Sequence, residues 1–171
     1  MRILTATLLA GTLAFSATAF AQDKTVVEIA VGSEAHTTLV AAVQAAGLVE
    51  TLSGEGPFTV FAPVNDAFAA LPAGTVETLL KPENKDQLTK ILTCHVVGAE
   101  VMSSAVAKLI ADGGGTANVE TLGGCTLQAR LDGDKVTLTD PAGGVATVTA
   151  VDLDASNGVI HVIDKVLLPA S

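Results

Sequence analysis

The chain has 171 residues, with 18 acidic and nine basic side chains and a formal net charge of −9 at pH 7. Its few Lys and Arg residues are scattered, which excludes nucleic acid and anionic lipid surfaces as electrostatic partners. The length suits one domain with one hydrophobic core, and such a core folds without a metal or a dense set of disulfides.

The N-terminal residues have the features of an export signal. Arg2 is followed by an apolar run without charged residues as far as Phe20, and small residues offer a cleavage site before Gln22. A membrane anchor is the alternative interpretation, but the run contains glycine, Thr and Ser and leads directly into the cleavage pattern. We therefore expect residues 1–21 to be a cleaved signal peptide. Residues 22–171 are expected to form a single soluble domain, secreted or periplasmic, without direct membrane insertion.

Helical spacing dominates the first half of this domain and period-two alternation dominates the second half, so the order of elements predicts an α+β fold. Leu39, Ala42, Val43 and Ala46 would share one helix face, and Gly47 is placed to end that helix. Further helices are expected near residues 79–80, 82–92 and 101–111.

A short buried strand is predicted at residues 58–62. Phe58 and Val60 alternate with Thr59 and Phe61, so both faces of the strand are largely apolar and are expected to be covered. Pro63 would end the strand because it cannot donate to a sheet.

A helical turn is expected directly after this strand. Asn65 or Asp66 would cap the turn that contains Phe68, and Pro72 would stop it. The chain has five Phe and neither Trp nor Tyr. Large aromatic burial is therefore expected to concentrate at Phe58, Phe61 and Phe68.

A β-meander is predicted for the second half, with glycine-containing turns between its strands. Leu127, Ala129 and Leu131 would share one face, and Val136 and Leu138 would supply the matching face across the hairpin. The expected strands are 117–122, 125–131, 135–139 and 145–151. A last strand is expected after a turn at residues 156–158.

Two segments of this sequence resemble the signature segments of the fasciclin domain family. They are the Thr-Val-Phe-Ala-Pro-x-Asn-x-Ala-Phe run at 59–68 and the Asn-Gly-Val-Ile-His-Val-Ile-Asp-x-Val-Leu-Leu-Pro run at 157–169. The segment 92–97 resembles the family's Tyr-His segment, with Cys94 where tyrosine is usual. The resemblance implies structural roles for the matching residues: Phe61, Pro63, Asn65, Phe68, His95, Asn157, Gly158, His161 and Asp164.

The resemblance also implies a fold and a function. The fold would be a compact α+β domain in which two β-sheets form a wedge flanked by helices. The function would be adhesion between cells or to a surface through a cell-surface or extracellular matrix protein, with self-association as one way to bridge two cells. In animal relatives the family's Tyr-His region is implicated in receptor contact. In this chain only the histidine of that pair, His95, matches. We expect His95 to serve the fold more than binding.

Cys94 and Cys125 are the two cysteines of the chain, and an exported protein has the oxidising compartment in which they can pair. A disulfide is the favoured interpretation, and two buried thiols are the alternative. The Cys-x-x-Cys spacing of redox enzymes is not present.

The three histidines are the first candidates for chemistry. His36 precedes a helix and is expected to be exposed, whereas His95 and His161 are expected in strands, where hydrogen-bonded structural imidazoles are common. The pattern at Asp152, Asp154 and Ser156 departs from a calcium loop in its sixth and twelfth positions. No nucleophile elbow or phosphate loop is found. We expect no enzymatic activity, no cofactor and no metal.

Two classes of function therefore remain open. An adhesion module is favoured by the family resemblance. A secreted or periplasmic carrier that binds a small ligand between sheet and helices is the alternative, although the sequence shows no convergent polar set for such a ligand.

Overall fold

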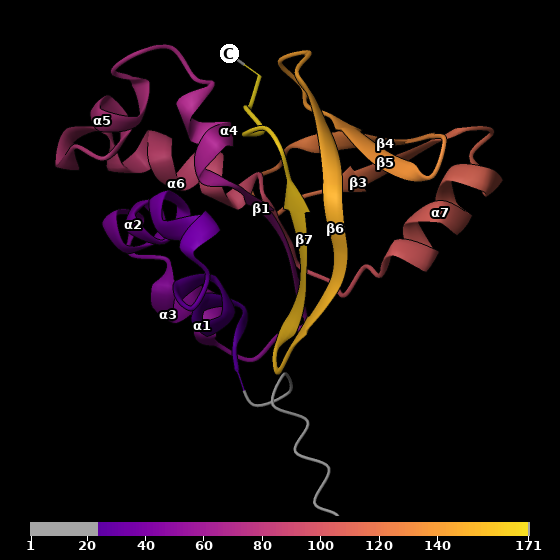
Figure 1. The fold of residues 1–171 in the computed structure, drawn as a ribbon, viewed down its shortest axis with the longest axis horizontal. Helices are drawn as coiled ribbons and strands as arrows, with labels where there is room; N and C mark the ends of the chain where they lie inside the picture. Colours follow the sequence, from indigo (N-terminus) through magenta and orange to yellow (C-terminus); the bar gives the residue numbers. More distant parts are fainter. Residues whose placement is uncertain (1–23, 171) are drawn as a thin grey trace, which may run out of the picture.

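The computed structural model describes residues 24–170. The predicted signal peptide at 1–21 lies outside the described residues. Helices gather on one side of a strongly curved sheet, and one further helix lies on its other side (Figure 1). The α+β class predicted from the order of elements is confirmed.

The helices are short, as the glycine and proline positions predicted. Gly47 ends the second helix in a left-handed conformation, with φ of 70°. The α-helices are α1 Val26–Val31, α2 Thr37–Ala46, α3 Val49–Ser53, α4 Asn65–Ala69, α5 Thr75–Leu79, α6 Lys85–Thr93 and α7 Ser103–Asp112. Short 3-10 helices lie at Glu34–His36 and Pro82–Asn84.

The strands form one sheet. They are β1 Phe58–Pro63, β2 Val96–Val97, β3 Thr116–Glu120, β4 Thr126–Asp132, β5 Lys135–Thr139, β6 Val145–Ala155 and β7 Gly158–Ile163. Their spatial order in this seven-stranded sheet is β2-β1-β7-β6-β5-β4-β3. All pairs are antiparallel except the parallel pair of β1 and β7.

The expected wedge of two β-sheets is wrong for the described residues. The long strand β6 connects the two halves, since Val145 to Thr147 pair with β5 and Val148 to Ala155 pair with β7. Register shifts between Val148 and Leu153 let this strand bend, as β-bulges do. The sheet then nearly closes, because Leu122 N–H donates to the carbonyl of Val96 in β2 at 2.8 Å.

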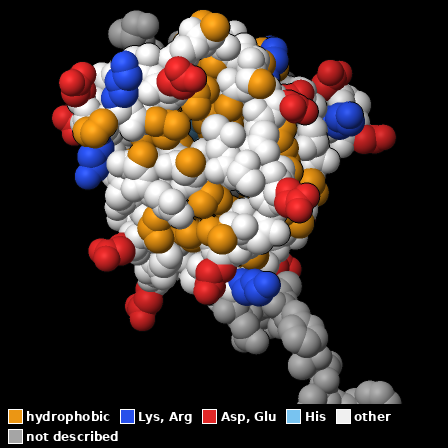
Figure 2. All heavy atoms as spheres, turned by 60° about the vertical axis from the view of Figure 1, so that its left-hand side comes forward, with side chains coloured by type: hydrophobic (Ala, Val, Ile, Leu, Met, Phe, Trp, Pro, Cys, Tyr) orange, Lys and Arg blue, Asp and Glu red, His pale blue; other side chains and the backbone are white. Residues whose placement is uncertain are grey.

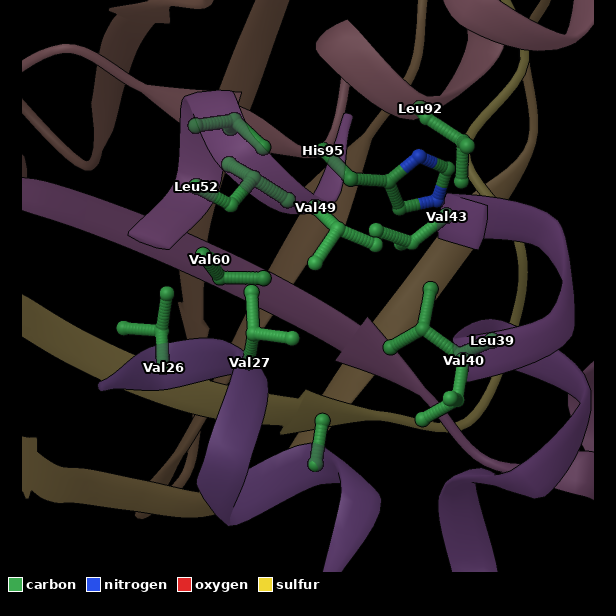
Figure 3. A pocket seen from close by; sticks show the side chains of 12 residues that line it. Val26, Val27, Leu39, Val40, Val43, Val49, Leu52, Val60, Leu92 and His95 are labelled. Carbon is green, nitrogen blue, oxygen red and sulfur yellow. The ribbon is translucent and has the colours of Figure 1, made fainter. Parts of the chain in front are cut away.

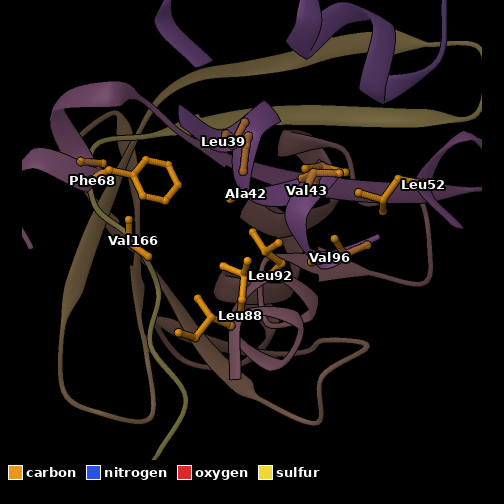
Figure 4. Close-up of a cluster of buried hydrophobic side chains, with 14 of the residues drawn as sticks. Leu39, Ala42, Val43, Leu52, Phe68, Leu88, Leu92, Val96 and Val166 are labelled. Atoms are coloured by element: carbon orange, nitrogen blue, oxygen red, sulfur yellow. The ribbon is translucent and has the colours of Figure 1, made fainter. Parts of the chain in front are cut away.

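Strand β1 lies between two hydrophobic clusters, where the chain length suggested one core, and both of its faces are covered as its alternation predicted. Val60 and Ala62 join a cluster under α1 to α6 (Figure 4), whereas Phe61 joins a cluster between the sheet and α7. Phe61 is 2% exposed. This burial of both faces explains why the strand has almost no polar residue.

Three local predictions are corrected by the structure. Helix α6 continues through Thr93, whose hydroxyl donates to the carbonyl of Thr89 at 2.8 Å, so His95 follows a helix and does not lie in a strand. Helix α4 begins after Val64 without a side-chain cap. The Asn65 side chain bonds Glu34 and Thr38 instead of capping this helix. His36 is buried, because the 3-10 helix at its position turns the ring inward against Ser33.

Candidate functional site

The two segments that carry the family resemblance lie side by side as β1 and β7. Their register pairs Phe58 with Gly158 and Phe61 with His161. A Cβ atom on Gly158 would lie 1.9 Å from the carbonyl oxygen of Phe58, so the pairing requires glycine at that position. Residues about 100 positions apart in the sequence therefore form one continuous centre.

Asn157 ties this centre to the N-terminal helices. Its Oδ1 accepts from the Val26 N–H at 3.0 Å, and its Nδ2 donates to the carbonyls of Leu52 and Gly54 at 2.7 and 2.9 Å. One amide side chain thus holds the start of α1 and the end of α3 against the β6–β7 turn.

Asn65 makes a similar connection at the other end of β1. Its Nδ2 donates to the carbonyl of Glu34 at 2.8 Å, and its Oδ1 accepts from the Thr38 N–H at 3.0 Å. Pro63 ends β1, and Phe68 is buried in the cluster under the helices. These matching residues fix helix α2 against the sheet.

His95 is buried, and both of its ring nitrogens bond main-chain groups. Nε2 accepts from the Leu167 N–H at 2.8 Å, so Nδ1 carries the proton and donates to the carbonyl of Ile91 at 2.8 Å. Burial lowers the pKa of His95 to about 4, although the Ile91 carbonyl and the charge of Asp140 act in the opposite direction. The ring is therefore neutral at pH 7 and joins α6 to the C-terminal segment.

Asp140 binds the main chain of Leu168, the residue that follows Leu167 in the C-terminal segment. Its Oδ2 accepts from the Leu168 N–H at 2.9 Å, and its Oδ1 accepts from the Gly144 N–H at 2.7 Å. Asp140 was not among the residues predicted from the sequence. Its position directly before the Pro141-to-Gly144 turn is a signal, because Asp at the start of a turn commonly bonds the turn's own backbone.

His161 packs its ring on Phe61, with centroids 5.7 Å apart. Its Nδ1 accepts from the Asp152 N–H at 3.3 Å, so Nε2 carries the proton and donates to the carbonyl of Val101 at 2.7 Å. This histidine connects β7 to β6 and to the segment that leads into α7.

Ser103, Asp152 and His161 are close together but do not form a catalytic triad. The Ser103 hydroxyl and N–H both donate to the Asp152 carboxylate, while the imidazole bonds only main-chain groups. Slight burial raises the pKa of Asp152, but the two bonds from Ser103 outweigh it and hold that pKa below its usual value. Asp152 also has φ of 55°, a conformation that Asp tolerates. The arrangement fastens the start of α7.

The remaining predicted residues lie where the sheet closes or turns. Cys94 and Cys125 form a disulfide with Cα atoms 5.4 Å apart, beside the contact between Leu122 and Val96. Asp164 accepts from the Thr147 N–H at 2.7 Å and holds β6 at the end of β7.

An apolar pocket lies between the helices and the sheet (Figure 3). Side chains of α1, α2, α3 and β1 surround it, and its free space is about 30 Å³. The labelled lining residues are Val26, Val27, Leu39, Val40, Val43, Val49, Leu52, Val60, Leu92 and His95. Small-molecule sites commonly measure about 300 to 1,000 Å³, so this hollow is far smaller than a metabolite site.

Within residues 24–170, no group of three or more His, Cys, Asp or Glu side chains lies close enough together to hold a metal ion. Nor does any helix in this described part have both the length and the apolar character needed to cross a bilayer.

Comparison with known proteins gives consistent matches. The fasciclin domain family model matches residues 34–169. Protein sll1483 of Synechocystis is 56% identical over 145 residues, which cover 85% of this chain and 73% of that protein. The transforming growth factor-beta-induced protein ig-h3 of Sus scrofa is 37% identical over 145 residues, covering 85% of this chain but 19% of that protein.

A solved structure has the same fold. It is a FAS1 domain pair from the insect cell adhesion molecule fasciclin I, with a TM-score of 0.56 and 22% sequence identity. The match covers 74% of this chain and 42% of that chain.

Proposed function

This chain belongs to the fasciclin domain family, and on that basis we propose that it is an exported, non-enzymatic module that mediates adhesion between cells or to a surface. Its partner would be a cell-surface or matrix protein. The protein would act in the periplasm or outside the cell. The fold relative, a domain pair of an insect cell adhesion molecule, supports this proposal.

One structural observation carries the proposal. The polar side chains of the family segments are engaged with the main chain of the protein itself: Asn65, His95, Asn157 and His161 each bond backbone groups of distant elements. Groups used in this way hold the scaffold together, which leaves recognition to the outer surface. We assign His95 a role in the fold for the same reason.

A carrier of a small apolar molecule is the second candidate. The apolar lining of the pocket between the helices and β1 is the observation in its favour, because small-molecule sites are lined mostly by apolar side chains. Its small free space favours the adhesion role instead.

Gene deletion in the host followed by addition of purified protein tests the proposal. We expect deletion to reduce cell aggregation or surface attachment, and added protein to restore it. Unchanged aggregation together with a growth defect on one nutrient would support the carrier and contradict adhesion. Sedimentation at several protein concentrations would show whether bridging uses self-association.

A further inference from the structure

Helices α1, α2 and α3 expose a group of apolar side chains, which we call the α1–α3 face. Figure 2 shows hydrophobic side chains gathered on the side of the molecule that carries these helices. Val31 is 58% exposed, the largest exposed fraction among the large hydrophobic residues of the described chain. The face comprises the exposed or partly exposed residues Val27, Ala30, Val31, Val40, Ala41 and Val49.

Helix α2 carries no charged residue and exposes small apolar side chains beside Thr37 and Gln44. Its inner side chains, including Leu39 and Val43, join the core, while Val40, Ala41 and Ala45 remain on its outer side. None of its ten residues is charged. A surface helix of a soluble protein normally carries charged residues opposite its buried side, whereas the outer side of α2 has only neutral residues. The outer side of α2 therefore has the composition of a contact surface.

The face also contains a hollow. The apolar pocket opens between α1, α2 and α3, and Val27, Val40 and Val49 of the face form part of its lining (Figure 3). Its free space of about 30 Å³ suits the end of one apolar side chain. Protein interfaces commonly concentrate their binding energy where one anchor side chain fills such a pocket.

The charges beside this face have mostly one sign. Between residues 25 and 57, every charged side chain is a glutamate: Glu28, Glu34, Glu50 and Glu55. All four are exposed. Two cations are also near: Lys24 precedes Thr25, the N-cap of α1, and the ammonium of Lys85 in α6 lies beside Gly47. Glu28 of α1 and Glu50 of α3 directly follow Val27 and Val49 of the face, so the border that these two helices supply is acidic.

We propose that the α1–α3 face docks a basic amphipathic segment of a partner protein, which inserts one apolar side chain into the hollow and places Lys or Arg against the glutamates. This proposal rests on the proposed adhesion function and names its contact surface. Opposite charges at the border of an interface increase the association rate and set the register of the partner.

The charge pattern also discriminates between occupants. A second copy of this chain would bring its own glutamates against the same border, and like charges across an interface oppose association. An anionic lipid surface would be repelled for the same reason. A basic segment satisfies both the apolar centre and the acidic border.

Binding of a labelled helical peptide of leucine and lysine tests the proposal, with a leucine–glutamate peptide of the same pattern as control. Fluorescence anisotropy should show binding of the lysine peptide alone, weakened by added salt. Val31→Lys and Glu50→Lys should each weaken binding by about tenfold. Leu109→Lys on α7 and Glu120→Lys on β3 are the matched controls, since both side chains are exposed on other elements. These controls should bind as the unmodified protein does.

Equal binding of both peptides, or equal binding by the face variants and their controls, would overturn the proposal. Ala41→Lys serves as a second face variant if Val31→Lys does not fold. Amide chemical shifts should change within α1 to α3 when the lysine peptide is added. Shifts that depend on protein concentration without peptide would assign the face to a second copy and overturn a basic partner.

The two proposals fail separately. If added unmodified protein restores aggregation and Val31→Lys does so equally, adhesion stands and the α1–α3 face is not its contact surface. If neither restores aggregation but the lysine peptide binds the face, the docking surface stands and the adhesion function is wrong.

Discussion

His95 and His161 each use one ring nitrogen as a donor and the other as an acceptor toward main-chain groups. A neutral imidazole is the form that can make both bonds, since a protonated ring has no acceptor. At the scale of single residues, both imidazoles thus hold distant segments together through one donor and one acceptor. Burial lowers the pKa of His95 to about 4, so its ring is neutral and keeps both bonds at pH 7.

The first prediction concerns His95 and pH. Its pKa falls from 6.5 in the unfolded chain to about 4 in the folded one, so its contribution is complete above pH 6.5 and is lost as pH falls toward 4. The loss should be on the order of 3 kcal/mol. Denaturant unfolding across this pH range would measure it. The His95→Gln variant should show a smaller dependence, and an identical dependence in both proteins would contradict the assignment.

The second prediction concerns Phe61, whose side chain is 2% exposed and packs on His161. Phe61→Ala should lower the free energy of unfolding by about 3 to 5 kcal/mol, because it leaves a cavity in the cluster between the sheet and α7. Chemical denaturation would measure the change. Leu109→Ala on the exposed side of α7 is the control, and we expect a change within about 0.5 kcal/mol there. A loss below about 1 kcal/mol for Phe61→Ala would contradict its burial.

At the scale of elements, helix α7 depends on a residue of another strand. Its first residue, Ser103, bonds the Asp152 carboxylate through both the N–H and the hydroxyl. Asp152 therefore does for α7 what an N-cap residue usually does within its own helix. The pKa of Asp152 is lowered, so the carboxylate stays ionised in mildly acidic solution.

The third prediction follows from this connection. Asp152→Ala should destabilise the protein by about 1 kcal/mol, as loss of an N-cap does, and should speed hydrogen exchange in α7 more than in α2. Asp154→Ala in the same strand is the matched control, because Asp154 is also exposed. Equal exchange rates in the two variants would show that Asp152 does not hold the helix.

At the scale of the whole molecule, the curved sheet closes by contacts that involve only a few residues. Leu122 bonds Val96, and Gly123 N–H donates to the carbonyl of Thr93 at 3.1 Å. The Cys94–Cys125 disulfide lies beside these bonds. The covalent link therefore stabilises the place where the first and last strands of the sheet order meet.

The fourth prediction concerns this disulfide, which spans 31 residues of sequence. Replacing both cysteines by alanine should lower the free energy of unfolding by about 3 to 4 kcal/mol, since the unfolded chain then gains freedom. Hydrogen exchange should increase in β2 and β3. Intact-mass analysis after alkylation gives a direct check, because two alkylated cysteines in unreduced protein would show that the link does not form.

The sequence alone determined the features that depend on neighbouring residues. The alternation around Phe61 predicted a strand buried on both faces, the spacing from Leu39 to Ala46 predicted α2, and Gly47 predicted its end. Hairpin turns in the second half were predicted for the same reason, because turn chemistry and periodicity act within a few positions. The order of helical and strand patterns gave the α+β class, and the two signature segments gave the family.

Only the tertiary structure decided how these elements are joined. The strands form one sheet where two were expected, because β6 bends and pairs with β5 along one part and with β7 along the other. The tertiary structure buried His36, and it paired His95 with Leu167, 72 positions away, and Asp140 with Leu168. Such contacts depend on the closure of long loops and on what packs against each side chain. A local sequence pattern contains neither of these.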